Sequence, residues 1–328
     1  MIARDGKPEG GCDGERRDER AMTGPGSESG SEIFAPELLS GRVALVTGGG
    51  TGLGKATALE LARCSATVTI AGRRAEMLEA TVAQVEGPGE ADWVSADVRE
   101  PDEAERLIHA VLERHGRLDV LVNNAGGQYF TPAELIAAKG WRAVWRLNVE
   151  GMLNMAETAF ELALRPGGGG TVVNVTLSPH HGMPGMAHSG SARATVEALT
   201  RELARRWSDA GVCVSAVAAG HFDTEVLAKY PATVRAATAR SIPLQRLGTP
   251  EEHAWLVALL ASPLGRAFNG STVTLDGARD NFAGAWPPPG LADASGEVPT
   301  EERKQPKVAR ENGVEQGGAV SEGADNIG

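Results

Sequence analysis

The sequence is poor in aromatic residues and contains only three cysteines and two tyrosines among its 328 residues. Cys12, Cys64 and Cys213 do not have the spacing of metal ligands, and Cys12 lies in a polar terminal segment. We therefore expect inert thiols in a reduced compartment. No metal site is predicted, because no carboxylate is suitably spaced with the histidines.

Long apolar runs and an excess of positive charge are also missing. No run reaches the length of a membrane-spanning helix, and the formal net charge of −11 argues against a nucleic-acid surface. The N-terminus carries charges where a signal peptide needs an apolar core. The C-terminal residues 326–328, Asn-Ile-Gly, are not a peroxisomal address. We expect a cytoplasmic protein without membrane or nucleic-acid partners.

Both ends of the chain almost lack large apolar side chains. Residues 1–32 and 291–328 are rich in glycine, acidic residues and serine. Such segments cannot bury enough apolar surface to offset the entropy lost on ordering, so two disordered tails are predicted. The intervening residues 33–290 are long enough to form one domain with a full core.

A glycine-rich stretch from Thr47 to Gly54 follows the apolar run Val43–Val46 and precedes a helical pattern, Lys55–Arg63. Strand, glycine turn and helix in this order make a phosphate cradle, since glycines allow a tight turn and helix-opening amides bind the charge. A merely structural turn is the alternative. The context favours dinucleotide binding.

Further apolar runs alternate with helical patterns through the middle of the chain. Strands are expected at 66–72, 93–98, 118–122, 171–176, 212–217 and 271–275. Helical patterns cover 77–85, 102–115, 133–164 with a break near Lys139-Gly140, 191–209, 223–240 and 250–261. This alternation predicts an α/β fold, a Rossmann-like doubly wound sheet of seven parallel strands whose ligands bind at the carboxyl ends of the strands.

Three motifs in this order resemble the short-chain dehydrogenase/reductase family. Thr47, Gly48, Gly52 and Gly54 match its Thr-Gly-x-x-x-Gly-x-Gly pattern. The segment 123–126, Asn-Asn-Ala-Gly, matches its Asn-Asn-Ala-Gly motif, and Asn148 matches its helix-borne asparagine.

The family's catalytic Tyr-x-x-x-Lys is replaced by Ser189 and Arg193. A ketone reductase needs a phenol to protonate an alkoxide, and serine is a much poorer acid, so ordinary ketone reduction is not expected. Ser-x-x-x-Arg resembles the enoyl-CoA and dienoyl-CoA reductase branch of the family, which includes peroxisomal trans-2-enoyl-CoA reductases. The stretches 126–129 and 188–194 share this resemblance.

Hydride addition to an enoyl thioester drives charge onto the thioester oxygen, which needs hydrogen-bond donors. The resemblance implies that Ser189 is such a donor, although a helix N-cap is its alternative role. Arg193 is expected to hold the nicotinamide ribose, and Asn148 to hold a water near the site. His188 is the candidate for reprotonating the α-carbon if it titrates near neutrality, and packing is its alternative role.

The second strand is followed by Arg73 and Arg74, where an NAD-preferring site usually has a carboxylate. The guanidinium group of arginine presents a fork of donors that suits a 2′-phosphate, so NADPH is predicted. The alternative is that the two arginines are solvated and bind no phosphate. The resemblance places Asp97 at the adenine ring, or as a helix cap, and Asn124 near the adenosine ribose. The expected cofactor contacts are Thr47, Gly48, Thr51, Gly52, Leu53, Gly54, Arg73, Arg74, Asp97, Val98, Asn124, Ala125, Gly126, Arg193, Gly220 and Thr224.

Other residues are weaker candidates. Thr176 and Ser178 compete for the place of the family's substrate-binding serine, and Asn174 is interpreted as structural. The resemblance brings Gly220 to the nicotinamide and Thr224 to the pyrophosphate. His180 and His181 are expected on a loop, and residues 225–242 form either a lid over an acyl chain or part of the core.

The leading functional hypothesis is NADPH-dependent reduction of the 2,3 double bond of an enoyl-CoA. Reduction of 2,4-dienoyl-CoA is an alternative, although that branch is expected to carry a tyrosine at the place of Ser178. A catalytically silent NADP(H)-binding protein is an alternative of another class. The resemblance also implies a homo-oligomer, a tetramer or dimer, built on the helices at 133–164 and 191–209.

Overall fold

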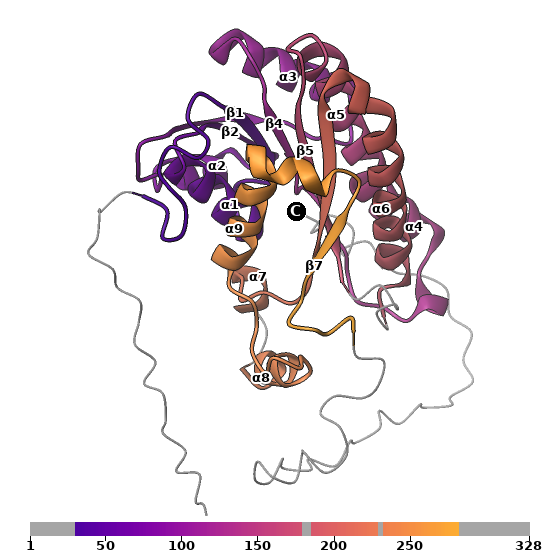
Figure 1. Ribbon diagram of the computed structural model, residues 1–328. Helices are drawn as coiled ribbons and strands as arrows, with labels where there is room; N and C mark the ends of the chain where they lie inside the picture. The colour runs from indigo at the N-terminus through magenta and orange to yellow at the C-terminus, as the bar shows by residue number, and fades with distance from the viewer. Residues whose placement is uncertain (1–29, 179–184, 229–231, 282–328) are drawn as a thin grey trace, which may run out of the picture.

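One parallel sheet of seven strands forms the centre of the molecule (Figure 1). The structure is a computed structural model that describes residues 30–178, 185–228 and 232–281. The strand order is β3-β2-β1-β4-β5-β6-β7, so the winding reverses between β1 and β4. Doubly wound sheets bind ligands at such a switch point. The strands are β1 (Val43–Thr47), β2 (Thr67–Gly72), β3 (Glu90–Ser95), β4 (Val120–Asn123), β5 (Gly170–Leu177), β6 (Val212–Ala219) and β7 (Thr272–Leu275).

Helices cover both faces of this sheet (Figure 1). One layer contains α1 (Gly52–Arg63), α2 (Ala75–Val82) and α9 (Pro250–Ala261). The other contains α3 (Pro101–His115), α4 (Ala138–Trp145), α5 (Gly151–Ala159) and α6 (Ala187–Trp207). The short helices α7 (Glu225–Ala228) and α8 (Ala232–Arg240) follow β6. The remaining turns are η1 (Ala133–Leu135), η2 (Arg146–Glu150), η3 (Phe160–Leu164), η4 (Ser208–Ala210) and η5 (Pro263–Phe268).

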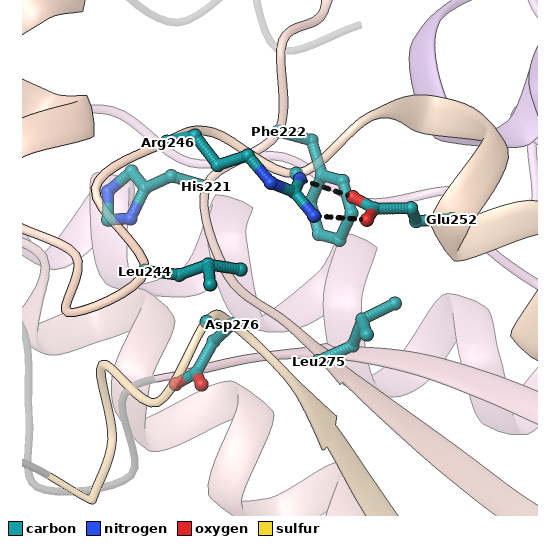
Figure 2. A pocket seen from close by; sticks show the side chains of 9 residues that line it. His221, Phe222, Leu244, Arg246, Glu252, Leu275 and Asp276 are labelled. Atoms are coloured by element: carbon teal, nitrogen blue, oxygen red, sulfur yellow. Dashed lines mark hydrogen bonds and ion pairs between the residues drawn. The ribbon is translucent and has the colours of Figure 1, made fainter. Parts of the chain in front are cut away.

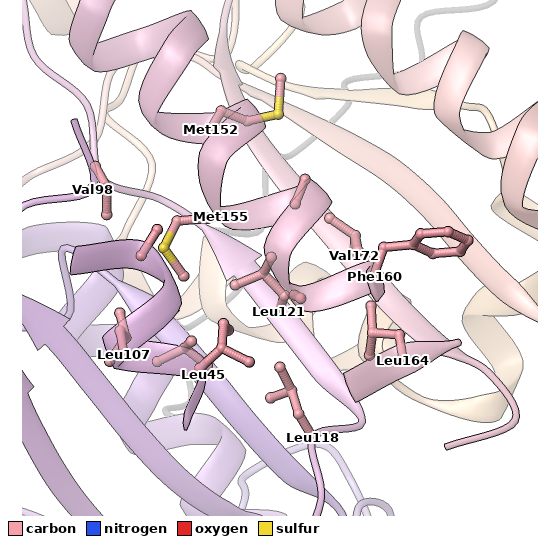
Figure 3. Packing of buried hydrophobic residues seen from close by; sticks show 14 of the residues in the cluster. Leu45, Val98, Leu107, Leu118, Leu121, Met152, Met155, Phe160, Leu164 and Val172 are labelled. Carbon is pink, nitrogen blue, oxygen red and sulfur yellow. The ribbon is translucent and has the colours of Figure 1, made fainter. Parts of the chain in front are cut away.

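Alternate residues of β1 reach the two layers, because successive side chains of a strand point to opposite faces. Val43 and Leu45 join the cluster that contains Leu107 of α3 and Met155 of α5 (Figure 3). Ala44 and Val46 join the second cluster, with α1 and α9. All five residues of β1 are buried, as expected for a strand that is covered on both faces.

The fold class is confirmed, but several expected boundaries were wrong. β3 ends at Ser95 and does not reach 98. The expected break near Lys139-Gly140 occurs at residues 136–137, between η1 and α4, and Gly140 itself lies inside α4. Gly140 is tolerated there because the hydroxyl of Tyr129 occupies the space of the missing side chain.

Helix α6 begins at Ala187, earlier than the predicted 191, because His188 and Ser189 are already buried in its first turn. Gly190 lies inside the helix with open space around it. The predicted tails lie mostly outside the described residues, as do 282–290 of the predicted domain. Among the described helices, none has the length and apolar character needed to cross a membrane.

Candidate functional site

The turn between β1 and α1 has the geometry of a phosphate cradle. Gly48 and Gly52 have φ angles of 67° and 55°, which glycine adopts without the strain that a side chain would add. A Cβ on Gly54 would lie 2.3 Å from both the side-chain nitrogen of Asn124 and the carbonyl oxygen of Gly48. The backbone therefore turns closely enough to fit a pyrophosphate at the start of α1.

Thr47 and the segment after β4 brace this turn. The Thr47 hydroxyl oxygen accepts hydrogen bonds from the backbone nitrogens of Asn124 and Ala125, at 3.1 and 3.0 Å. The side-chain nitrogen of Asn124 donates to the carbonyl oxygens of Thr47 and Gly48, at 3.0 and 3.2 Å. Asn124 thus holds the glycine turn in place.

The start of α7 lies over the same turn. A Cβ on Gly52 would be 3.8 Å from Thr224 Cγ2, so Thr224 is close to the expected pyrophosphate position. Lys55 of α1 and Glu225 of α7 form an ion pair at 3.5 Å, which sequence reasoning missed. This ion pair therefore joins α1 to α7 across the site.

Arg73 and Asp97 come together beyond the ends of β2 and β3. Three side-chain hydrogen bonds from Arg99 hold the pKa of the Asp97 carboxyl below its usual range, and the charge of Arg73 contributes. Arg74 is exposed and precedes α2. The alternative of Asp97 as a helix cap was wrong, because Glu100 occupies the N-cap of α3. Val98 is buried against Gly151.

Ser189 is fully buried in the first turn of α6. Its hydroxyl has no hydrogen-bond partner in the described part of the chain. The alternative of an N-cap was wrong, since Met186 precedes the helix and Ser189 is its third residue. A buried unpaired hydroxyl costs free energy, so this position is suited to a ligand that accepts its hydrogen bond.

Arg193 lies one turn further along α6 and contacts the segment after β4. Its Nη1 donates to the carbonyl oxygen of Val175 at 2.7 Å. A Cβ on Gly126 would be 2.4 Å from Arg193 Nη2 and 2.8 Å from Asn148 Oδ1, so these three residues converge. Burial lowers the pKa of Arg193 to about 10, and the group therefore stays charged at neutral pH.

Asn148 lies in the π-helical turn η2 and is 2% exposed. Its side-chain nitrogen donates to the carbonyl oxygens of Gly127 and Val144, both at 2.8 Å. Its Oδ1 accepts a hydrogen bond from the Gly127 nitrogen at 3.2 Å. Asn148 therefore fixes the chain after β4 beside Arg193.

His188 is enclosed by aromatic rings. Its ring meets Tyr129 edge to face at 4.5 Å between centroids, and Trp141 at 6.0 Å. Burial lowers the pKa of His188 and so favours the neutral imidazole over the charged one. The role of His188 in reprotonating the α-carbon stays a prediction. Tyr129 was not singled out for this contact, because 58 intervening positions separate it from His188 in sequence.

Neither of the two competing hydroxyls, in β5 and just after it, is free. Thr176 donates to Glu197 Oε1 at 3.0 Å, and Ser178 donates to the carboxylate of Asp276. The Asn174 side chain accepts a hydrogen bond from Asn123 of β4 at 3.0 Å and donates one to Thr200 of α6 at 2.9 Å. His180, His181 and Tyr230 lie outside the described residues. Within the described ranges, no cluster of three metal-binding side chains occurs.

Comparison with known proteins identifies the family of the chain. A family model described as "Enoyl-(Acyl carrier protein) reductase" matches residues 48–278. The chain is 32% identical to 3-oxoacyl-[acyl-carrier-protein] reductase of Thermotoga maritima, covering 73% of this chain and 98% of that protein. It is 32% identical to peroxisomal 2,4-dienoyl-CoA reductase of Danio rerio, covering 78% and 85% of the two chains.

A probable 2,4-dienoyl-CoA reductase of Bacillus subtilis is 35% identical over 72% of this chain and 95% of its own. Among solved structures, the citronellol catabolism dehydrogenase of Pseudomonas aeruginosa is 38% identical with a TM-score of 0.68, covering 76% and 98%. The resemblance inferred from the motifs is thus confirmed. The chain belongs to the short-chain dehydrogenase/reductase family of oxidoreductases, which use a nicotinamide cofactor.

Proposed function

We propose that this protein reduces the 2,3 double bond of an enoyl-CoA thioester with NADPH. The observation that carries the proposal is the buried, unpaired hydroxyl of Ser189, which stands where the family has its catalytic tyrosine. Arg193 lies one helical turn away in place of the family's lysine. This pair suits stabilisation of an enolate better than protonation of an alkoxide.

Bound NADPH would supply a hydride to the β-carbon. As negative charge develops on the thioester oxygen, Ser189 would donate a hydrogen bond to it in a site that excludes water. Arg193 would keep positive potential beside this oxygen and hold the nicotinamide ribose. It stays charged in the buried site, so it acts by position and charge and not as a proton relay.

Asn148 and His188 would support this pair. The backbone of Gly127 is held by both polar atoms of the Asn148 side chain, which keeps the neighbouring Gly126 against Arg193. Neutral His188 would offer a ring nitrogen as a hydrogen-bonding group, because neither nitrogen is paired within the described chain. The proton for the α-carbon is then expected from water.

The preference for NADPH rests on Arg73 and Arg74. Both are exposed beyond β2, where a 2′-phosphate would lie, and the segment lacks the carboxylate that would repel it. Replacing both with alanine should weaken NADPH binding more than NADH binding. Isothermal titration with each dinucleotide measures this difference, and equal losses would contradict the assignment.

The proposal extends to the acyl carrier, the assembly and the cover of the site. The acyl carrier is coenzyme A, in keeping with the 2,4-dienoyl-CoA reductases among the relatives. The protein is a cytoplasmic homo-oligomer that associates through α4, α5 and α6. Helices α7 and α8 act as a lid over the acyl chain.

The deciding experiment follows NADPH oxidation with crotonyl-CoA and decenoyl-CoA. Ser189→Ala should lower kcat about a hundredfold, as loss of an oxyanion donor does. A normal rate in Ser189→Ala would remove the proposed donor and leave a reductase. No turnover of either substrate by a wild-type protein that binds NADPH tightly would favour the silent binding protein.

Reduction of 2,4-dienoyl-CoA is the second candidate, favoured by relatives of that name at 32% and 35% identity. The position of Ser178 counts against it, since its hydroxyl is committed to Asp276. Loss of the conjugated diene absorbance of 2,4-decadienoyl-CoA tests this reaction directly. Faster turnover of the diene than of decenoyl-CoA would make it the better assignment.

A further inference from the structure

The ends of β5, β6 and β7 meet at one carboxylate, Asp276, which the proposed chemistry does not use. The hydroxyl of Ser178 donates to Asp276 Oδ2, and the backbone nitrogen of Asp280 donates to the same oxygen at 2.7 Å. Ser178 is only 1% exposed. Removing the carboxylate would therefore leave a buried hydroxyl without its acceptor.

Asp276 also supports the turn after β6. A Cβ on Gly220 would lie 2.5 Å from Asp276 Cβ and 2.7 Å from its Cα. The Gly220 nitrogen donates to the carbonyl oxygen of Leu275 at 3.0 Å. The backbone at Gly220 thus rests directly on Asp276, and the absence of a side chain at 220 permits this approach.

The same turn, residues 276–280, holds the segment that follows α8. Arg279 Nη1 donates to the carbonyl oxygen of Ser241 at 2.6 Å. The Leu244 nitrogen donates to the carbonyl oxygen of Gly277 at 3.2 Å. The turn 276–280 therefore contacts the Gly220 turn on one side and the end of α8 on the other.

A cavity of about 60 Å³ lies beside this junction, with His221, Leu244 and Asp276 among its lining residues (Figure 2). Its size admits a few water molecules. Nδ1 of His221 is buried and has no partner within the described residues. Side-chain packing around the Gly220 turn is therefore incomplete on the side where Asp276 lies against Gly220. The far side of the turn is held by the backbone, where the Gly248 nitrogen donates to the His221 carbonyl oxygen at 2.9 Å.

We propose that Asp276 is a positioning residue that fixes the Gly220 turn where the nicotinamide ring binds. Through the turn 276–280, it links this position to the end of α8. The inference rests on the proposed function, because it needs a bound NADPH whose nicotinamide meets Gly220, as the family resemblance implies. In this proposal Asp276 acts through the Gly220 turn and not by a contact of its own with the dinucleotide.

The test separates the two halves of the dinucleotide by comparing NADPH with 2′-phospho-ADP-ribose, which lacks the nicotinamide. Asp276→Ala keeps the Cβ beside Gly220 but removes the carboxylate that anchors the turn 276–280 to Ser178 and to the Asp280 nitrogen. It should therefore let the turn shift and weaken NADPH binding about tenfold, the effect of losing a hydrogen bond to a charged group. The affinity for 2′-phospho-ADP-ribose should stay within about twofold, because the adenine end does not contact the Gly220 turn. Asp276→Asn keeps an acceptor oxygen and should restore most of the NADPH affinity.

Two further variants make the result independent of folding defects. Ser178→Ala in the Asp276→Ala background should add little loss of NADPH affinity, since both changes remove the same hydrogen bond. Asp209→Ala, at an exposed aspartate in η4, is the control and should bind both ligands normally. Thermal unfolding of each variant verifies that the domain is intact.

Equal weakening of both ligands, or no change in either, would overturn the role of Asp276. The role would be supported if Asp276→Ala lost affinity for NADPH but not for 2′-phospho-ADP-ribose, and if Asp276→Asn regained the affinity for NADPH. A wild-type protein that binds neither NADPH nor NADH would instead sink the proposed function, and this inference would fall with it. If the protein binds NADPH but reduces no enoyl-CoA, the comparison of NADPH with 2′-phospho-ADP-ribose still decides the role of Asp276.

Discussion

At the scale of single residues, the start of α6 contains polar atoms that the folded chain leaves unsatisfied. The Ser189 hydroxyl, both ring nitrogens of His188 and Nε of Arg193 are buried without partners among the described residues. Each such group costs about 1–3 kcal/mol. Their concentration within two helical turns indicates a place where stability is given up for ligand binding.

Gly126 provides a test of the contact between Arg193 and Asn148. In Gly126→Ala, the new methyl group would lie 2.4 Å from Arg193 Nη2 and would displace the buried guanidinium. We expect NADPH affinity to fall at least tenfold and the unfolding midpoint to drop, because the displaced charge loses its bond to Val175. Fluorescence titration with NADPH and thermal unfolding measure the two effects.

The matched control is Gly190→Ala, also near the site but with open space around the glycine. Alanine there should stabilise α6 by up to about 1 kcal/mol, since alanine has the higher helix propensity. NADPH binding should remain normal. Similar behaviour of the two alanine variants would show that the Arg193 contact does not govern binding.

At the scale of elements, Tyr129 joins the chain after β4 to both α4 and α6. Its ring contacts His188 of α6, and a Cβ on Gly140 of α4 would lie 1.9 Å from its hydroxyl oxygen. Gly140→Ala should therefore displace Tyr129, destabilise the domain by about 1–3 kcal/mol and lower turnover. Denaturant unfolding and the enoyl-CoA assay measure these losses.

A double-mutant cycle isolates this contact. Tyr129→Phe removes the hydroxyl that meets Gly140, so Gly140→Ala should cost much less stability in that background than in the wild type. An identical cost in both backgrounds would mean that the alanine acts through the backbone of α4. The Tyr129 hydroxyl would then play no part in positioning the chain after β4.

The sequence predicted those elements whose characteristic residues lie together in one short stretch of the chain. The glycine turn, β1 and α1 follow each other directly, and their order alone indicates a phosphate cradle. The start of α6 was misplaced because the apolar residues at helical spacing begin only at Val196, whereas the polar His188 and Ser189 are buried in its first turn. Tertiary burial overrode a local propensity there.

The same reasoning explains what was missed in the site. Ser178 and Asp276 are 98 residues apart, and no local pattern joins a serine after one strand to an aspartate after another. The positions of Arg193, Gly126 and Asn148 could be inferred from family motifs, but their convergence depends on how α6 packs against β5 and η2. Such contacts become visible only once the sheet order is known.

At the scale of the whole molecule, buried histidines link stability to pH. Burial lowers the pKa values of His188 and His221, and that of His253 to about 4. His253 is fully buried in α9, with its Nδ1 3.4 Å from the Thr57 hydroxyl oxygen of α1. The folded chain therefore favours a neutral imidazole at His253, in the interface between α9 and α1.

The sign of the pH effect follows from proton binding. Between pH 6.5 and 4 the unfolded chain binds a proton at His253 that the folded chain does not, so the free energy of unfolding falls as the pH falls through this window. One such group accounts for a loss of about 3 kcal/mol in the free energy of unfolding at pH 4 relative to pH 7.

His253→Gln should remove this part of the pH dependence, which urea unfolding from pH 7 to 4 measures. An unaltered slope in His253→Gln would assign the acid sensitivity to other groups and separate it from the packing of α9 against α1.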